Sequence, residues 1–143
     1  MYQHILLPTD GSAAATHAVE TGIRLAAQLG ARVHALHVLP PLPAVSFLAD
    51  VIQGDVYTRR AIQRAGDYLA DVREKAEAAG VPCATEYVFD NRPYAAIAGS
   101  ASKHHCDLIV MGAHLHNGLE GLLLSNVTHK VILNCDAPVL VCH

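Results

Sequence analysis

Short apolar runs alternate with segments of helical periodicity along the whole chain. The apolar runs predict five strands, at Ile5–Pro8, Val33–Leu39, Cys83–Phe89, Asp107–Met111 and Pro138–Cys142. Strands that alternate with helices form parallel sheets through right-handed crossovers. The runs are almost continuously apolar, which is typical of strands buried on both faces. The pattern therefore predicts an α/β fold around a parallel sheet.

Two of the intervening helices are marked by the spacing of their apolar residues. The first has a stripe at Ala15, Val19, Ile23 and Ala26, with Ser12 or Thr9 as its N-cap and Gly30 as its stop. The second has a stripe at Ala61, Ala65, Leu69, Val72, Ala76 and Ala79 and ends at Gly80. Its other face carries charged residues, including Arg64, which we interpret as solvated.

Less regular segments complete the predicted elements. Residues 44–56 show no clear period and predict a loop with at most a short helical turn. Pro93 suits the first turn of a third helix, because its missing N–H costs nothing there. A fourth helix is predicted from about Asn126 to Asn134.

Composition narrows the possible classes of protein. The chain has 143 residues, the size of one domain, and neither a repeat nor a linker divides residues 1–143. Hydrophobic residues make up 52% and charged residues 16%, which excludes a disordered chain. A net charge of −3 argues against nucleic-acid binding. No apolar run approaches the ~20 residues of a membrane span, and no signal peptide is visible, so we expect a cytoplasmic protein.

The cysteines form no local metal or redox motif. Cys83, Cys106, Cys135 and Cys142 include no C-x-x-C pair, so we expect buried free thiols.

Parallel sheets bind ligands beyond the carboxyl ends of their strands. Two loops that directly follow predicted strands lie at this edge of the sheet. One is Pro8-Thr9-Asp10-Gly11-Ser12, and the other is the glycine-bearing segment from Gly112 to Thr128. Glycines and a helix N-terminus together can cradle a phosphate through backbone N–H groups. The same glycines could equally serve turn geometry alone. The dinucleotide and P-loop fingerprints are absent.

At this point the chain resembles the universal stress protein family. The resemblance rests on Pro8-Thr9-Asp10-Gly11-Ser12, Leu36-His37-Val38, Val110-Met111-Gly112 and Ala137-Pro138-Val139-Leu140-Val141, in order along the chain. It implies an adenine nucleotide alpha hydrolase-like fold, with an open five-stranded parallel sheet in the order 3-2-1-4-5 and helices on both faces. It also implies a homodimer through the last strand, at Val139, Leu140 and Val141. ATP or AMP is the implied ligand, with Mg²⁺ accompanying ATP.

The family's nucleotide motif, G-x2-G-x9-G-[ST], is only partly present. Gly112 matches its first position, whereas Leu115, Ser125 and Asn126 replace the other three. Val127 and Thr128 do follow the pattern of relatives that bind ATP. By the same resemblance Asp10 lies by the ribose or phosphates, Val38 and Met111 lie by the adenine, and Pro8 and Thr9 belong to the same binding site.

These departures predict weak binding. No Lys or Arg occurs from Gly112 to Asn126, so a triphosphate would rely on backbone N–H groups, hydroxyls and His114 or His116. Protonated imidazole is the better donor, and we therefore expect tighter binding at pH 6 than at pH 8.

Two other functions remain open. Leu115 could fill the crevice and leave a stress-response interaction module with an unknown protein partner. The ten histidines and the cysteines could instead form a metal-binding protein, but His104-His105-Cys106, His114-x-His116 and Cys142-His143 lack the spacing of a recognised site. We assign no metal ligand, and expect His34 and His37 to be packed or hydrogen-bonded. No catalytic residue is evident, so the chain is not predicted to be an enzyme.

Overall fold

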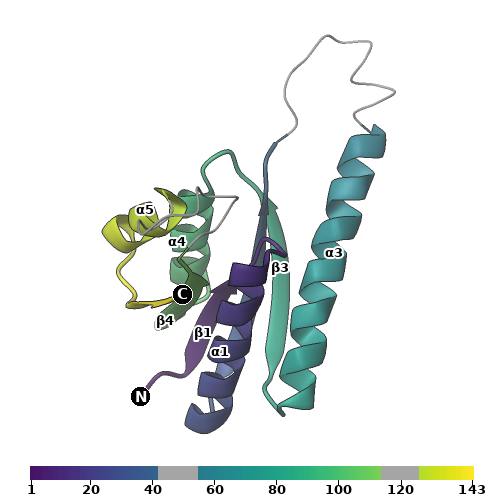
Figure 1. Ribbon diagram of the computed structural model, residues 1–143. Helices are drawn as coiled ribbons and strands as arrows, with labels where there is room; N and C mark the ends of the chain where they lie inside the picture. The colour runs from purple at the N-terminus through teal and green to yellow at the C-terminus, as the bar shows by residue number, and fades with distance from the viewer. Residues whose placement is uncertain (42–54, 114–125) are drawn as a thin grey trace.

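The computed structural model describes residues 1–41, 55–113 and 126–143 (Figure 1). Strands and helices alternate along these ranges, as the hydrophobic pattern predicts. The elements are β1 His4–Pro8, α1 Ala13–Leu29, β2 Arg32–Leu39, α3 Asp55–Ala78, β3 Cys83–Phe89, α4 Pro93–Lys103, β4 Leu108–Gly112, α5 Asn126–Asn134 and β5 Val139–Cys142.

The five strands form one parallel sheet in the order β3-β2-β1-β4-β5, which confirms the predicted topology. β1 lies at the centre and pairs with β2 on one side and β4 on the other. The chain thus winds outward from β1 in both directions. In such sheets the reversal of winding leaves a crevice at the carboxyl ends of the strands.

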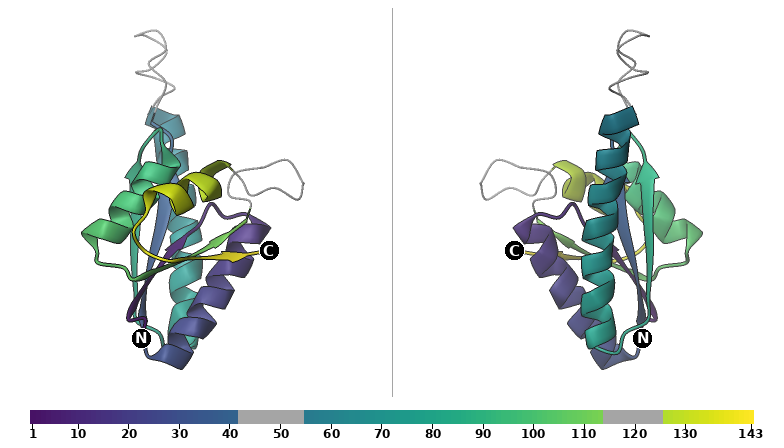
Figure 2. Two further views of the ribbon diagram at one scale, coloured as in Figure 1. Left: turned by 90° about the vertical axis from the view of Figure 1, so that its left-hand side faces the viewer. Right: turned by 90° about the vertical axis from the view of Figure 1, so that its right-hand side faces the viewer.

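Helices cover both faces of the sheet, as predicted. α1 and α3 lie on one face, and α4 and α5 on the other (Figures 1 and 2). Successive residues of a strand alternate between these layers. In β1, Ile5 and Leu7 pack towards α1 and α3, whereas Leu6 packs towards α4 and α5.

Local signals set both ends of α1. Ser12 is the N-cap of α1 and accepts a hydrogen bond from the Ala15 N–H at 3.2 Å. Gly30 ends that helix with a φ of 67°. α3 begins at Asp55, so residues 55 and 56 are helical and not part of the predicted loop, and residues 44–54 lie outside the described residues. Ala79 follows the helix and is exposed, so it does not extend the buried stripe.

Two strands begin one residue later than predicted, at Leu108 and Val139. Asp107 has a different role, because its carboxylate accepts hydrogen bonds from the backbone N–H groups of Gln3 and His4 at 2.9 and 3.0 Å. This contact fixes the start of β1 beside β4. None of the helices in the described ranges combines the length and apolar character that a bilayer crossing requires.

The cysteines are free, as predicted, but only one of them is buried. Burial raises the pKa of the Cys106 thiol to about 11, so this thiol stays protonated near neutral pH. Cys83, Cys135 and Cys142 are half-buried.

Helix α1 packs closely against the sheet at Gly22. A Cβ there would overlap Cδ2 of the fully buried Leu7 and lie 3.4 Å from the Val110 Cβ. We predict that Gly22→Ala lowers the free energy of unfolding by about 1–3 kcal/mol through overpacking. Gly66→Ala in α3 is the matched control, because nothing lies within 4 Å of its added Cβ. It should raise stability by about 0.5–1 kcal/mol through helix propensity. Urea denaturation measures the free energy of unfolding of both variants, and equal changes in the two would contradict the close packing at Gly22.

Candidate functional site

A hollow of about 640 Å³ opens at the carboxyl ends of β1 and β2, beside α3. We call it the crevice. Three segments line it: the loop after β1, the end of β2, and one face of α3. Its lining residues are Asp10, Gly11, Ser12, His37, Val38, Leu39, Pro40, Tyr57, Ala61, Arg64 and Tyr68. A volume of this size falls in the usual range for small-molecule sites.

The loop after β1 is held by its own side chains. The Asp10 carboxylate accepts a hydrogen bond from the Ser12 N–H at 2.9 Å, and the Thr9 hydroxyl accepts one from the Gly11 N–H at 3.2 Å. Gly11 has a φ of 78°, which L side chains rarely adopt, and a Cβ there would overlap the Tyr68 ring. The loop therefore passes directly beneath a tyrosine of α3.

His37 ties the three segments together. Its Nδ1–H donates to the Thr9 carbonyl at 2.7 Å, and its ring meets the Tyr68 ring edge-on, with 5.4 Å between centroids. Because a carbonyl only accepts, the proton must lie on Nδ1, and Nε2 is the acceptor of the neutral ring. The expectation that His37 is hydrogen-bonded is confirmed.

Arg64 lies on the solvated face that the sequence pattern predicts, and it also lines the crevice, which the pattern does not predict. Tyr57, Ala61, Arg64 and Tyr68 follow one another at intervals of four, three and four residues, so they share one face of α3. This face borders the crevice, although Arg64 itself stays exposed. The charged side chain therefore lies at the mouth of the hollow. The helical spacing of Tyr57, Ala61 and Tyr68 is the signal in the sequence that could have placed Arg64 on the same face as these residues.

The end of β4 is fixed by a buried threonine. The Thr128 hydroxyl, in α5, donates to the Gly112 carbonyl at 3.0 Å, and Thr128 is fully buried. A Cβ at Gly112 would lie 3.1 Å from the Ala14 carbonyl oxygen of α1. The Thr128 hydrogen bond holds the start of α5 to the end of β4, so Thr128 has a structural role here, and Gly112 packs β4 closely against α1.

The residues that the resemblance assigns to nucleotide binding fall into three groups. Asp10 and Val38 line the crevice. Pro8, Thr9, Met111, Gly112 and Thr128 are buried, Val127 is half-buried, and Asn126 is exposed at the first position of α5. His114, Leu115 and Ser125 lie outside the described residues. The role of each in binding stays a prediction.

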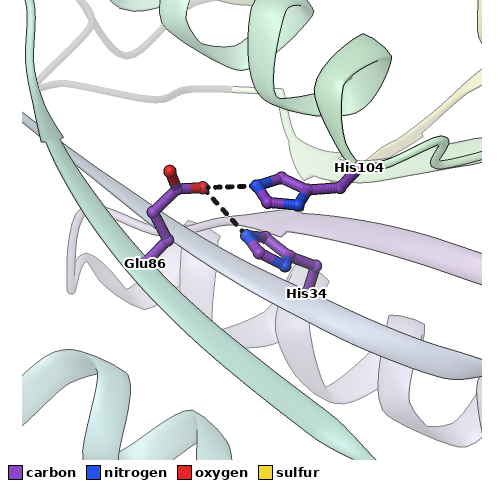
Figure 3. A group of neighbouring side chains, drawn as sticks. All are labelled: His34, Glu86 and His104. Carbon is purple, nitrogen blue, oxygen red and sulfur yellow. Dashed lines mark hydrogen bonds and ion pairs between the residues drawn. The ribbon is translucent and has the colours of Figure 1, made fainter.

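A second polar cluster lies on the α4 face of the sheet. His34 in β2 and His104 at the end of α4 both donate through Nε2 to one oxygen, Oε2 of Glu86 in β3, at 3.0 and 3.1 Å (Figure 3). The Ser100 hydroxyl donates to the same oxygen at 3.2 Å. We call His34, Glu86 and His104 the histidine–glutamate cluster. It confirms that His34 is hydrogen-bonded, whereas none of the local His and Cys groupings in the sequence predicts these three residues together.

Burial and hydrogen bonding shift the pKa values in and beside this cluster. Burial lowers the pKa of His34, against the opposing effect of Glu86. Burial and the Arg32 charge lower the pKa of His4, whose Nδ1–H donates to the His104 carbonyl at 2.9 Å. Burial acts to raise the pKa of Glu86, but hydrogen bonds from His34, Ser100 and His104 outweigh it and lower that pKa.

These shifts predict a protein that acid destabilises. Below the ordinary histidine pKa of 6.5 the unfolded chain binds protons that folded His4 and His34 do not, so stability falls as pH falls. The stabilisation from Glu86, present above pH 4.5, is lost at still lower pH, as pH falls through its folded-state pKa. In metal-free buffer the urea midpoint should drop from pH 7.5 to pH 5. His4→Gln should reduce this drop and His17→Gln, on the exposed side of α1, should not. A pH-independent midpoint would contradict the account.

Comparisons with known proteins place the chain in one family. The model of the universal stress protein family matches residues 1–143. A universal stress protein of Methanocaldococcus jannaschii is 34% identical over 141 residues, which cover 99% of this chain and 82% of that protein. A universal stress protein of Thermus aquaticus is 32% identical over 142 residues, which cover 99% of this chain and 98% of that protein.

Solved structures agree with the fold. Universal stress protein UspA from Lactobacillus plantarum superposes with a TM-score of 0.88 at 24% identity, over 99% of this chain and 98% of that one. A universal stress protein in complex with cAMP gives a TM-score of 0.75 at 27% identity, over 99% and 97%. The sheet order and these likenesses show the adenine nucleotide alpha hydrolase-like fold. The chain belongs to the universal stress protein family.

Proposed function

We propose that this protein binds an adenine nucleotide, ATP or AMP, in the crevice, and acts as a cytoplasmic stress-response sensor and not as a turnover enzyme. The observation that carries the proposal is the set of groups that meet there. Tyr57, Tyr68 and Val38 offer apolar and aromatic surface for a base. Asp10 and Ser12 offer polar groups beside it. A related universal stress protein, 27% identical to this chain, has been solved in complex with cAMP, which supports a ligand of this chemistry.

Phosphate groups would find positive potential on two sides of the crevice. Arg64 carries a guanidinium at its mouth, and Ser12 marks the N-terminus of the 17-residue helix α1. Helix N-termini attract anions through their free N–H groups and the helix dipole. Arg64 thus supplies a cation that the segment from Gly112 to Asn126 lacks. Mg²⁺ bound with ATP would offset the Asp10 charge, since carboxylates and phosphates are its preferred ligands.

The nucleotide proposal predicts a phosphate-dependent effect of Arg64. Arg64→Ala should weaken ATP binding by about tenfold, the value of one solvent-exposed charge-assisted contact, and leave adenosine binding unchanged. Isothermal titration calorimetry with ATP and with adenosine measures both. Arg60→Ala, on the same helix but outside the crevice lining, is the matched control. Equal affinities for ATP in the Arg64 and Arg60 variants would contradict the assignment of Arg64.

The interaction-module alternative depends on Leu115. If the Leu115 side chain excludes the phosphates, Leu115→Gly should create strong ATP binding that the parent protein lacks. If the parent already binds ATP and Leu115→Gly changes little, the interaction module loses its physical basis.

We also propose that the protein forms a homodimer through β5. Among the described strands, β5 ends the sheet and pairs with β4 alone, so its outer edge carries backbone groups ready to pair with a second copy. Leu140 is 40% exposed, and Ile132 and Leu133 of the preceding helix are 42% and 69% exposed. Apolar surface beside an open strand edge favours burial against a partner.

The dimer proposal predicts that Val139→Asp with Val141→Asp yields a monomer by light scattering, because two charges would be buried at the strand edge. Leu140→Asp tests the same edge at a more exposed position if the double variant fails to fold. Val56→Asp in α3, at a position that is 50% exposed, is the control and should remain dimeric. A dimer that persists in folded Leu140→Asp protein places the interface elsewhere.

A further inference from the structure

The histidine–glutamate cluster brings potential metal ligands together from three elements. His34 comes from β2, Glu86 from β3 and His104 from the residue that ends α4 (Figure 3). Each offers one ligand atom, and these atoms all lie within 4.8 Å of one another. Among the residues that the structure describes, this is the group in which at least three His, Cys, Asp or Glu ligand atoms lie this close together. His34 and Glu86 are 52 residues apart in sequence, so only the parallel register of β2 and β3 makes them neighbours.

We propose that His34, Glu86 and His104 bind a single divalent transition-metal ion of the zinc type. Two imidazole nitrogens and one carboxylate oxygen form a ligand set typical of zinc sites that keep one position open. Mixed nitrogen and oxygen donors also select such ions over Mg²⁺, which prefers oxygen ligands alone. The site is therefore separate in chemistry from the Mg²⁺ that would accompany ATP.

The distances already approach those of a coordinated ion. Ligand atoms that bind one tetrahedral zinc at about 2.0–2.2 Å lie roughly 3.3–3.6 Å apart. Here Oε2 of Glu86 lies 3.0 Å from Nε2 of His34 and 3.1 Å from Nε2 of His104. The two rings are stacked, with 4.1 Å between centroids and 26° between planes, so metal binding requires them to splay apart. The His104 side chain is 29% exposed and ends its helix, so it has room to turn.

Neighbouring contacts orient the ligands. The Ser100 hydroxyl holds Oε2 of Glu86, a contact that metal binding leaves possible because the oxygen keeps a free lone pair. His105 has a φ of 54°, which is rare for a residue other than glycine, and directly follows His104. The Cys106 N–H donates to the Ala101 carbonyl at 2.8 Å and closes this helix end. Supporting partners of this kind are characteristic of metal sites.

Solvent access to the histidine–glutamate cluster and the charges around it also bear on the binding of a divalent ion. A second hollow of about 450 Å³, lined by His4, Arg32, His34, Cys83 and His104 among others, adjoins the cluster and leaves room for a water as fourth ligand. Lys103, whose Nζ lies 4.0 Å from Oε1 of Glu86, and Arg32 oppose the ion's charge. The Glu86 carboxylate is the counter-charge that favours it.

The test is calorimetric titration of Zn²⁺ into chelator-treated, dialysed protein, with thermal unfolding measured in parallel. The parent should take up one ion per chain, and its Tm should rise because the ion binds the folded state. His104→Gln and Glu86→Gln should each weaken binding by more than about 100-fold, since loss of an outer-shell partner alone typically costs 10- to 100-fold. Circular dichroism verifies that each variant folds, and His104→Gln, at a half-exposed helix end, is the safer of the two. Mg²⁺ should give no saturable signal.

Two controls separate this site from the other histidines. His129→Gln, on the exposed face of α5, should bind Zn²⁺ like the parent. His114→Gln with His116→Gln should also bind like the parent if the cluster is the site. The proposal is overturned if the parent shows no saturable Zn²⁺ binding. It is equally overturned if folded His104→Gln binds as the parent does, or if only the His114 and His116 double variant loses the ion.

Discussion

The pairing of β1 with β2 on one side and β4 on the other is the constraint on which the rest of the structure depends. β1 is buried throughout, and its two neighbours are reached by crossovers on opposite faces of the sheet. Because the chain winds away from β1 in both directions, none of the helices in the described ranges crosses the carboxyl end of this strand. The loop at Asp10 therefore borders a crevice. The His37 contact with Thr9 then fixes that loop against β2.

Local and periodic information in the sequence was sufficient to predict the elements and the parallel α/β class, whereas the strand order was predicted from the resemblance to the universal stress protein family. Continuous apolar runs predicted the five strands, and stripes such as Ala65, Leu69, Val72 and Ala76 predicted the buried face of α3. Local chemistry also predicted Gly30 as the end of α1 and left Ser12 and Thr9 as alternatives for its N-cap, of which Ser12 is the cap. The errors lie at the ends of elements. Asp107, for example, was predicted to begin the fourth strand, but it precedes β4, and its carboxylate accepts hydrogen bonds from the backbone at the start of β1.

The sites were less predictable, because their residues converge from distant elements. Periodicity assigned Arg64 to a solvated face correctly, but it does not show that this face also borders a hollow at the end of β2. His34, Glu86 and His104 share no motif, and strand register and the end of α4 alone bring them together. Within β2, His34 lies near the start and Val38 near the end. The cluster and the crevice thus occupy opposite ends of one strand and can be tested independently.

The central claim is that the crevice holds an adenine nucleotide despite the incomplete glycine motif. The most direct measurement is to extract small molecules from protein purified without added ligand and identify them by mass spectrometry, and then to measure ATP uptake by equilibrium dialysis, which retains a weakly bound ligand. The account predicts saturable ATP uptake by the parent protein in dialysis, and none by a Tyr68→Trp variant that fills the crevice. An empty extract together with no saturable uptake in dialysis would contradict nucleotide binding and favour the interaction module.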